Sequence, residues 1–259
     1  MDRELALVTG ASAGIGTHLA RLFAADGSDL VLVARRGERL EALAQDLRAG
    51  HGVQVHVIPF DLGRPRAAEA LVAELAARGL EVDVLVNNAG FGARGRFTGQ
   101  EPELLRAMID LNVTELVALT RALLPAMVAR GRGGVVNIAS TAAFQAGPYM
   151  SVYYATKAFV LSFTEGLAVE LDSSGVTACC VCPGATRTEF ADVAGMTDLK
   201  LFDLTAMDAR KVARIGYRGF RRGRTVVVTG LSNWLGSIGA QIAPRVLSRW
   251  LVGRMQAPE

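Results

Sequence analysis

Histidine, cysteine and aromatic residues are all scarce in this chain. Three histidines and three cysteines occur among 259 residues, and 6% of the residues are aromatic. The cysteines share one apolar stretch, at Cys179, Cys180 and Cys182. Because no histidine lies near them, they predict small buried side chains rather than a metal site or a disulfide framework. The histidines fall outside every motif described below, so we expect no zinc site and no histidine base.

Signs of a domain boundary are also missing. No Pro/Gly/Ser-rich linker, low-complexity tract or internal repeat divides residues 1–259, which predicts a single domain with one large core. The first expected strand begins at Leu5, which leaves no room for a signal peptide and predicts a cytoplasmic protein. The net charge is only +3. Nothing resembles a nucleic-acid module with aromatic stacking residues, so we expect no nucleic-acid partner.

Short apolar runs alternate with helical patterns along the chain. Hydrophobic residues make up 51% of it. The runs span residues 5–9, 29–34, 54–59, 82–87, 135–140, 176–182 and 225–229. Such alternation is typical of parallel strands that are buried on both faces. We therefore predict an α/β fold, a doubly wound Rossmann-type parallel sheet of about seven strands flanked by helices.

A glycine-rich turn follows the first apolar run and precedes a helical pattern. It reads Thr-Gly-Ala-Ser-Ala-Gly-Ile-Gly from Thr9 to Gly16. Glycines permit a tight turn and let backbone N–H groups approach a pyrophosphate at the helix amino terminus. The spacing differs from the commoner Gly-x-Gly-x-x-Gly. The turn predicts a dinucleotide site formed by Gly10, Ser12, Ala13, Gly14, Ile15 and Gly16.

A tyrosine and a lysine four residues apart indicate acid–base chemistry. Tyr153 and Lys157 lie on one face of a helix if their segment is helical. We expect the Lys157 ammonium to lower the pKa of the Tyr153 phenol, which is otherwise about 10. Ser140 ends an apolar run, which places its hydroxyl at the carboxyl edge of the sheet, where open α/β folds bind ligands. Tyr154 also satisfies helix spacing to Lys157, so spacing alone leaves both tyrosines as candidates.

These segments together resemble the classical short-chain dehydrogenases/reductases. The resemblance covers roughly the first 190 residues and is carried by motifs in the same order and spacing. They are Thr9 to Gly16, Asn87-Asn88-Ala89-Gly90, Asn112, Ser140, Tyr153 with Lys157, and Pro183-Gly184. The resemblance selects Tyr153 over Tyr154 as the acid/base. It further implies that Ser140 holds the substrate oxygen, that Lys157 lowers the tyrosine pKa and binds the nicotinamide ribose, and that Asn112 supports a water chain.

The end of the second expected strand bears on cofactor choice. An acidic residue there usually bonds the ribose 2′-hydroxyl of NAD, whereas arginine suits a 2′-phosphate. This strand is followed by Arg35 and Arg36, with no acid until Glu38. Planar guanidinium groups bind phosphate bidentately, so we predict that NADP(H) is preferred over NAD(H). A solvated basic turn is the alternative interpretation.

Further cofactor contacts are implied by the resemblance. Asp61 and Leu62 match the adenine-binding pair of the family. Asn88, Ala89 and Gly90 would line the adenosine side. Pro183 and Gly184 would bend the chain toward the nicotinamide. The remaining expected contacts, with the carboxamide and the pyrophosphate, are made by Thr186 and Thr188.

The substrate side is expected from the last third of the chain. By resemblance, residues 186–224 form a substrate lid region, with the lid itself at 190–206. Apolar side chains suggest an apolar pocket, although ordinary packing is an equal alternative. They are Phe190, Met196, Leu199, Leu201 and Phe202, with Phe91, Phe97, Phe144 and Tyr149.

Two carboxyl-terminal features leave alternatives open. The basic cluster at 210–224 is read first as a solvated helix face and second as a site for an acidic partner. Residues 231–259 form a helical apolar pattern with two tryptophans and several arginines. We expect a subunit interface of a homodimer or homotetramer, or a pocket wall. Contact with a membrane surface is less favoured, and a transmembrane span is a poor fit.

The residues thus predict one dinucleotide-binding catalytic domain with three possible functions. The first is an NADP(H)-dependent oxidoreductase acting on an apolar ketone, an aldehyde or the corresponding alcohol. The second is a 3-oxoacyl-thioester reductase that uses the same site. The third is an NADP-binding regulatory or scaffold protein, which intact catalytic positions argue against.

Overall fold

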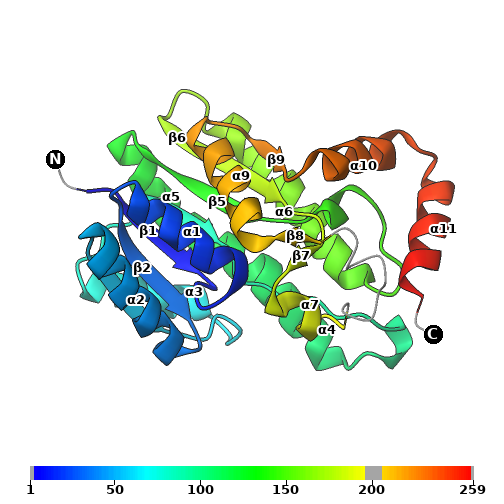
Figure 1. Ribbon diagram of the computed structural model, residues 1–259, viewed down its shortest axis with the longest axis horizontal. Coiled ribbons are helices and arrows are strands. Elements are labelled where there is room, and N and C mark those ends of the chain that lie inside the picture. Colours follow the sequence, from blue (N-terminus) through cyan, green and yellow to red (C-terminus); the bar gives the residue numbers. More distant parts are fainter. Residues whose placement is uncertain (1–2, 196–205, 258–259) are drawn as a thin grey trace.

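The central feature of the computed structural model is a parallel sheet in which successive strands are added first on one side of the first strand and then on its other side. The structure describes residues 3–195 and 206–257. All seven strands pair in parallel in the order β3-β2-β1-β4-β5-β6-β9 (Figure 1). Their bounds are β1 Leu5–Thr9, β2 Asp29–Ala34, β3 Val55–Pro59, β4 Val84–Asn87, β5 Gly133–Ile138, β6 Val176–Cys182 and β9 Val226–Val228. The predicted doubly wound sheet is confirmed.

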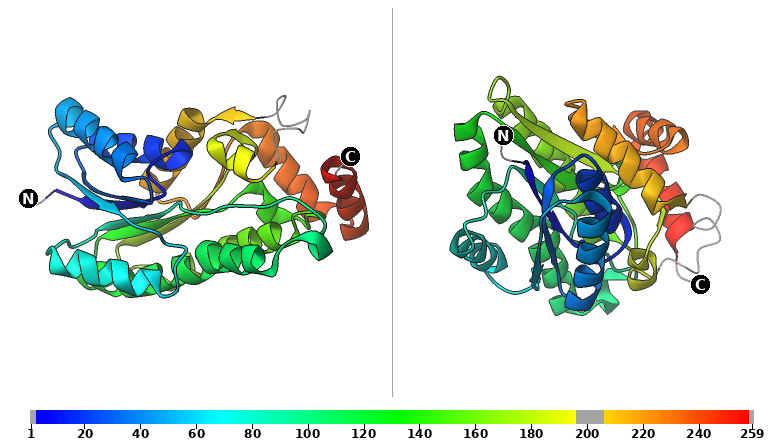
Figure 2. Two further views of the ribbon diagram at one scale, coloured as in Figure 1. Left: turned by 90° about the horizontal axis from the view of Figure 1, so that it is seen from below. Right: turned by 60° about the vertical axis from the view of Figure 1, so that its left-hand side comes forward.

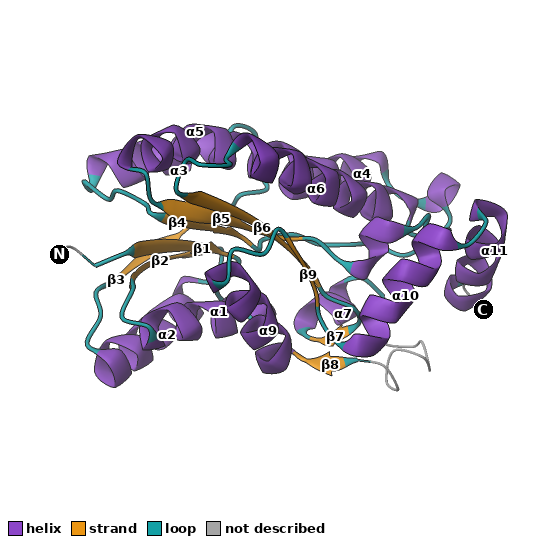
Figure 3. Cartoon of the chain, turned by 90° about the horizontal axis from the view of Figure 1, so that it is seen from above, coloured by secondary structure: helices purple, strands orange, loops and turns teal. Residues whose placement is uncertain are grey.

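Helices cover both faces of this sheet, as Figure 3 shows. One layer contains α1 (Gly14–Ala25), α2 (Gly37–His51) and α9 (Ala209–Arg221). The opposite layer contains α3 (Ala67–Ala77), α5 (Glu115–Arg130) and α6 (Ser151–Glu170), with α4 (Pro102–Ile109) beyond them. The strands are apolar because they are buried from both sides, and alternate residues of β1 belong to different core clusters. Two apolar layers therefore hold the sheet.

Short irregular elements follow several strands at the carboxyl edge of the sheet. They are the 3₁₀ turns η1 (Phe97–Gly99) and η3 (Thr141–Phe144) and the π-helical turn η2 (Asp110–Thr114). A two-stranded sheet joins β7 (Thr186–Arg187) to β8 (Met207–Asp208), and α7 (Glu189–Val193) follows β7. Loops and turns at this edge carry the candidate site, as expected for an open α/β fold.

The carboxyl-terminal helices extend from the sheet rather than cover it. The helix α10 (Leu231–Ile242) follows β9, and α11 (Arg245–Gln256) follows α10. Figure 2 shows α11 at the opposite end of the molecule from α2. The α10 helix packs against η3. The last helices thus lie near η3, which follows β5 at the carboxyl edge of the sheet.

The helical stretch Pro102–Arg130 is long and apolar enough to cross a membrane by length and composition. This feature is weak evidence, because core helices of soluble proteins pass the same test. Within that stretch, α5 packs against α3 and β5. Those contacts bury Leu119 and Met127 of α5 in the core.

Candidate active site

The glycine turn between β1 and α1 has no room for side chains at two of its glycines. Gly10 has a φ of +65°, a conformation that glycine adopts without steric cost. A Cβ atom at Gly10 would lie 2.7 Å from Asn88 Nδ2. At Gly16 it would lie 2.5 Å from both Asn88 Nδ2 and the Gly10 carbonyl oxygen. The predicted turn is therefore a closely packed one.

Asn88 and Thr9 hold the turn against the end of β4. The Asn88 Nδ2 group donates to the carbonyl oxygens of Thr9, at 2.9 Å, and of Gly10, at 3.2 Å. The Thr9 hydroxyl accepts from the backbone N–H groups of Asn88 and Ala89 and donates to the Val86 carbonyl. The Asn88 side chain thus braces the glycine turn from β4.

The first turn of α1 offers backbone donors to an anion. Its N-cap residue, Ala13, provides no side-chain hydrogen bond, and the first turn has no acidic residue. Ser12 lies beside Ala13, and its hydroxyl accepts from Arg36 at 3.3 Å. Free N–H groups at a helix amino terminus favour a phosphate. A dinucleotide pyrophosphate therefore fits this turn.

The two arginines after β2 differ in their surroundings. Arg36 forms an ion pair with Glu189 at 2.7 Å, and Arg39 pairs with the other oxygen of the same carboxylate at 2.5 Å. Arg35 is exposed and has no ion pair within residues 3–195 and 206–257. Sequence reasoning did not find Glu189, because 153 residues separate it from Arg36 and no local pattern links them. Only Arg35 matches the expectation of an available guanidinium.

Other predicted nucleotide contacts lie around the same edge of the sheet. Asp61 accepts a hydrogen bond from the Gly63 N–H at 2.9 Å, and Leu62 is buried. A Cβ at Gly14 would lie 2.9 Å from the Thr188 methyl group, so the segment after β7 reaches the glycine turn. Thr186 donates to the Gly184 carbonyl at 2.9 Å, which shapes the turn after Pro183.

Tyr153 and Ser140 come together at the carboxyl end of β5. Ser140 caps η3 by accepting from the Ala142 N–H at 3.1 Å, and its hydroxyl donates to the Pro183 carbonyl at 3.3 Å. The Ser140 hydroxyl lies close enough to the Tyr153 hydroxyl to act on the pKa of that phenol. Tyr153 is buried, with 8% of its surface exposed. The serine and the tyrosine that the motifs single out are therefore neighbours in the structure.

The predicted lowering of the tyrosine pKa is wrong for this structure. Burial raises the pKa of Tyr153 above its ordinary value, and the Ser140 hydrogen bond offsets only part of that rise. Lys157 does not contribute to the shift, because its Nζ lies 5.8 Å from the ring centroid and donates instead to the Ile138 carbonyl at 2.8 Å. Tyr153 is therefore a neutral phenol here, suited to donating a proton.

Lys157 is itself buried beneath the site. Burial lowers its pKa from 10.5 to about 8, although Cys180 and Cys182 act in the opposite direction. A Cβ atom added at Gly90 would lie 3.6 Å from Lys157 Nζ, so the Gly90 backbone passes close to the ammonium. A small change in pH near 8 therefore alters the charge of this group.

Asn112 is positioned by the π-helical turn η2. Its Oδ1 accepts from the Phe91 N–H at 3.1 Å, and its Nδ2 donates to the Phe91 carbonyl at 2.9 Å. Nδ2 also lies 3.2 Å from the Thr156 hydroxyl on α6. A π-helical turn inside a helix often marks a functional site. Here it links the Asn88–Gly90 segment to the helix that carries Tyr153.

The apolar residues predicted to form a pocket divide into separate groups. Phe91 and Phe190 pack in the cluster that contains Tyr153, and the Phe190 ring centroid lies 5.5 Å from that of Tyr153. Phe97 is 61% exposed, and Phe144 belongs to another cluster. Tyr149 contacts Arg96 instead. The remaining members lie outside the described residues: Met196, Leu199, Leu201 and Phe202.

The carboxyl terminus contributes contacts that sequence reasoning missed. Gln256 Nε2 donates to the Tyr154 hydroxyl, and Gln256 is 7% exposed. Arg94 donates to the carbonyls of Gln256, at 3.0 Å, and Ala257, at 2.8 Å. A Cβ at Gly253 would lie 3.5 Å from Pro148. Residues 253–257 therefore lie beside Tyr154 and Pro148 on the helix and loop next to Tyr153, and the helical pattern at 231–259 was the sequence signal for this segment.

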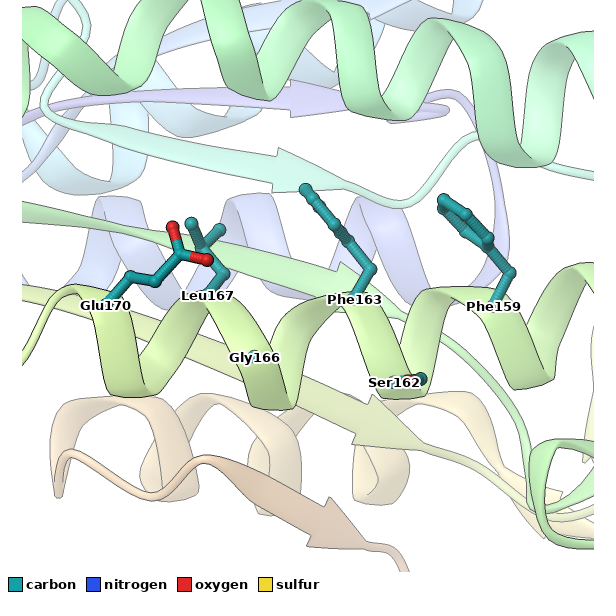
Figure 4. Close-up of a pocket in the computed structure, with 6 residues that line it drawn as sticks. All are labelled: Phe159, Ser162, Phe163, Gly166, Leu167 and Glu170. Carbon is teal, nitrogen blue, oxygen red and sulfur yellow. The ribbon is translucent and has the colours of Figure 1, made fainter.

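A surface groove of about 460 Å³ lies on the outer face of α6, away from these groups. Figure 4 shows Phe159, Phe163, Leu167 and Glu170 projecting from one side of the helix. The rings of Phe159 and Phe163 are stacked, with centroids 5.9 Å apart. Lys157 is buried on the same helix. In the part of the chain that the structure describes, no group of three or more His, Cys, Asp or Glu side chains could hold a metal ion.

Known proteins resemble this chain along most of its length. A family model for short chain dehydrogenases matches residues 4–197. Dehydrogenase/reductase SDR family member 7B of Bos taurus is 37% identical over 190 residues, which cover 71% of this chain and 58% of that protein. The NADP-dependent 3-hydroxy acid dehydrogenase of Salmonella typhi is 40% identical, over 73% of this chain and 75% of that protein. A putative ketoacyl reductase of Streptomyces coelicolor is 38% identical, over 73% of each.

Solved structures agree with the family match. A short-chain dehydrogenase from Sphingobium yanoikuyae in complex with NADPH has a TM-score of 0.82 and 39% identity, covering 92% of this chain and 93% of that one. A short chain dehydrogenase/reductase from Burkholderia phymatum in complex with NAD has a TM-score of 0.79 and 26% identity, covering 92% of each chain. The seven-stranded fold agrees with these matches. The chain is an oxidoreductase and belongs to the short-chain dehydrogenase family.

Proposed function

We propose that this protein transfers a hydride between NADP(H) and an apolar ketone or aldehyde, or the corresponding alcohol. One observation carries the proposal. The Ser140 hydroxyl and the Tyr153 phenol are neighbours at the carboxyl edge of the sheet, where a substrate oxygen could reach both. Lys157 and Asn112 lie beneath them.

The residues fit a nicotinamide dinucleotide. Gly10, Gly14 and Gly16 allow the turn to pack closely at the start of α1, whose first turn has no side-chain cap on its N–H groups and could bind a pyrophosphate. When bound, NADP(H) supplies or accepts the hydride. Pro183, Gly184, Thr186 and Thr188 would hold the nicotinamide end, and Lys157 would bind its ribose.

Tyr153 would act as the proton donor during carbonyl reduction. Its raised pKa keeps the phenol protonated, so a proton is available for the oxygen that gains negative charge. Ser140 would donate a hydrogen bond to that same oxygen. Lys157 would bind the nicotinamide ribose beside this phenol, and Asn112 would support a water chain that returns a proton to Tyr153.

The NADP(H) preference is supported by Arg35 and by two of the matches. Arg35 is exposed at the end of β2, where the adenosine ribose is expected. The Sphingobium yanoikuyae protein carries NADPH, and the Salmonella typhi relative is NADP-dependent. The NAD complex of the Burkholderia phymatum protein shows that the same fold also accepts NAD.

The substrate side would come from two segments. We assign residues 186–224 as a lid region and residues 231–259 as a pocket wall, which the Gln256 and Arg94 contacts support. Most of the expected lid, residues 196–205, lies outside the described residues. The stacked phenylalanines on α6 support assembly into a homodimer or homotetramer.

A 3-oxoacyl-thioester reductase is the second candidate. The putative ketoacyl reductase of Streptomyces coelicolor supports it, and so do arginines on α9. Arg221 forms an ion pair with Glu4 at 2.7 Å, whereas Arg210, Arg214 and Arg218 are exposed. Those exposed cations could attract an acidic acyl carrier.

The test is oxidation of NADPH, followed at about 340 nm, with ketones, aldehydes and acyl thioesters, and with NADH in parallel. We expect turnover with an apolar ketone or aldehyde. Activity confined to acyl thioesters would favour the second candidate. Tight NADPH binding without turnover of any substrate would favour the regulatory or scaffold alternative.

A further inference from the structure

The carboxylate of Glu189 bridges two arginines beside the glycine turn. Its Oε2 lies 2.7 Å from Arg36 Nη1, and its Oε1 lies 2.5 Å from Arg39 Nη1. The two guanidinium groups hold the pKa of the Glu189 carboxyl below its usual value, the Arg39 hydrogen bond most of all. Glu189 is therefore an anion bound by both arginines.

The bridge lies at the adenosine end of the expected cofactor site. Arg36 follows β2, and it also donates to the hydroxyl of Ser12 in the glycine turn at 3.3 Å. Glu189 begins α7, whose preceding residue, Thr188, reaches Gly14. The end of β2 is where a dinucleotide ribose is read in this kind of fold. The Glu189 carboxylate thus lies where the 2′-phosphate of NADP(H) would contact Arg36.

A carboxylate and a phosphate are alternative partners for the same guanidinium. Each arginine offers a planar set of N–H donors that either anion can accept. The side chains of Arg36, Arg39 and Glu189 are 43%, 52% and 47% exposed, so water screens the pairs and their exchange is energetically accessible. Arg35, on the same turn, has no such carboxylate in the described residues.

We propose that Glu189 sets the cofactor preference by competing with the 2′-phosphate of NADP(H) for Arg36 and Arg39. The inference rests on the proposed NADP(H)-dependent function. NAD(H) has no 2′-phosphate, so its binding leaves the bridge intact. NADP(H) must displace the carboxylate, which reduces the gain from its phosphate. Glu189 is therefore a specificity-determining residue. It reduces the preference for NADP(H) over NAD(H) that Arg35 provides.

The test compares Glu189→Gln with wild-type protein by calorimetric titration of four ligands. The ligands are NADPH, NADH and the fragments adenosine 2′,5′-bisphosphate and 5′-AMP, so no turnover is needed. We expect Glu189→Gln to bind NADPH and the bisphosphate about 3- to 30-fold more tightly, since two exposed ion pairs are removed. Binding of NADH and 5′-AMP should stay within about twofold. The gain should shrink in high salt.

Three further variants separate competition from a general effect of charge. Glu38→Gln removes the same charge from the first turn of α2, where Glu38 is exposed and forms no ion pair within the described ranges. It should change binding of the bisphosphate by less than about twofold. When Arg36 and Arg39 are both replaced by alanine, adding Glu189→Gln should not increase affinity for the bisphosphate any further. That non-additivity is what a mutant cycle shows when the replaced residues share one interaction.

The outcomes distinguish this inference from the proposed function. Unchanged bisphosphate binding by Glu189→Gln, or equal weakening of NADPH and NADH, would overturn the competition. Equal weakening would show that Glu189 holds α7 over either cofactor. Failure of wild-type protein to bind either dinucleotide would instead reject the proposed function itself.

Discussion

The two sides of the active site are built in different ways. The cofactor side is a tightly packed turn, in which Gly10 and Gly16 leave no room for a Cβ beside Asn88. The proposed substrate side ends in α10 and α11, where Trp234 is 47% exposed and Ile242 is 79% exposed. Arg254 stacks over Trp250 at 4.2 Å on the same surface.

This difference separates what holds the dinucleotide from what selects the substrate. On the proposed cofactor side, a Cβ atom added at Gly10, Gly14 or Gly16 would lie less than 3.0 Å from a neighbouring atom. Individual side chains reach across the molecule on the substrate side, as Gln256 does to Tyr154. Substitutions should therefore act on cofactor binding in one region and on substrate selection in the other.

The largest expected effect is at Lys157, which lies beneath both sides. Its pKa of about 8 means that the ammonium is lost as pH rises through that value, so kcat/KM for carbonyl reduction should fall above pH 8 and level off below it. Lys157→Met should lower kcat/KM by about 10²-fold or more and abolish this limb. NADPH affinity measured over the same pH range separates loss of ribose binding by Lys157 from loss of catalysis. A wild-type profile that stays flat between about pH 6 and 9.5 would contradict the role assigned to Lys157.

On the cofactor side, Gly16→Ala should weaken NADPH binding by about 10- to 100-fold. The added Cβ would lie 2.5 Å from Asn88 Nδ2 and from the Gly10 carbonyl, and such overpacking costs about 1–3 kcal/mol. Calorimetric titration and a thermal melt would measure the two consequences. Gly50→Ala is the matched control, because nothing lies within 4 Å of a Cβ at that helical position. Wild-type affinity in Gly16→Ala would show that the turn is not closely packed.

On the substrate side, Gln256→Leu should have the smallest effect. Loss of the hydrogen bond to Tyr154 should lower kcat/KM for the best ketone or aldehyde by about 2- to 10-fold, with unchanged NADPH affinity. Gln241→Leu is the control, since Gln241 donates to Ser237 in its own helix. If Gln256→Leu weakened NADPH binding instead, the separation between the two sides would fail.

The cofactor side could be predicted from the sequence because its signals are local. The apolar run 225–229 became β9 at Val226–Val228, and the glycine turn lies between β1 and α1 as expected. Burial on both faces makes each such strand a recognisable apolar run. The motif resemblance then predicted that Ser140 and Tyr153 act together at the carboxyl edge of the sheet.

The rest depends on contacts between distant residues, which no local pattern contains. Glu189 forms an ion pair with Arg36 although 153 positions separate them, so no local pattern indicated that Arg36 has a partner. Gln256 and Arg94 are likewise far apart in the chain. The tyrosine pKa was predicted in the wrong direction, because helix spacing gives the proximity of Lys157 but not the burial of both groups.

Single-turnover oxidation of NADPH by wild-type protein and by Tyr153→Phe is the most direct test of the proposed chemistry. Phenylalanine keeps the ring but removes the proton that reduction requires. We expect the rate of hydride transfer to fall by about 10²- to 10⁴-fold while the Kd for NADPH stays within about twofold. A Tyr153→Phe variant that still reduces the carbonyl at the wild-type rate would contradict the assignment of Tyr153 as proton donor.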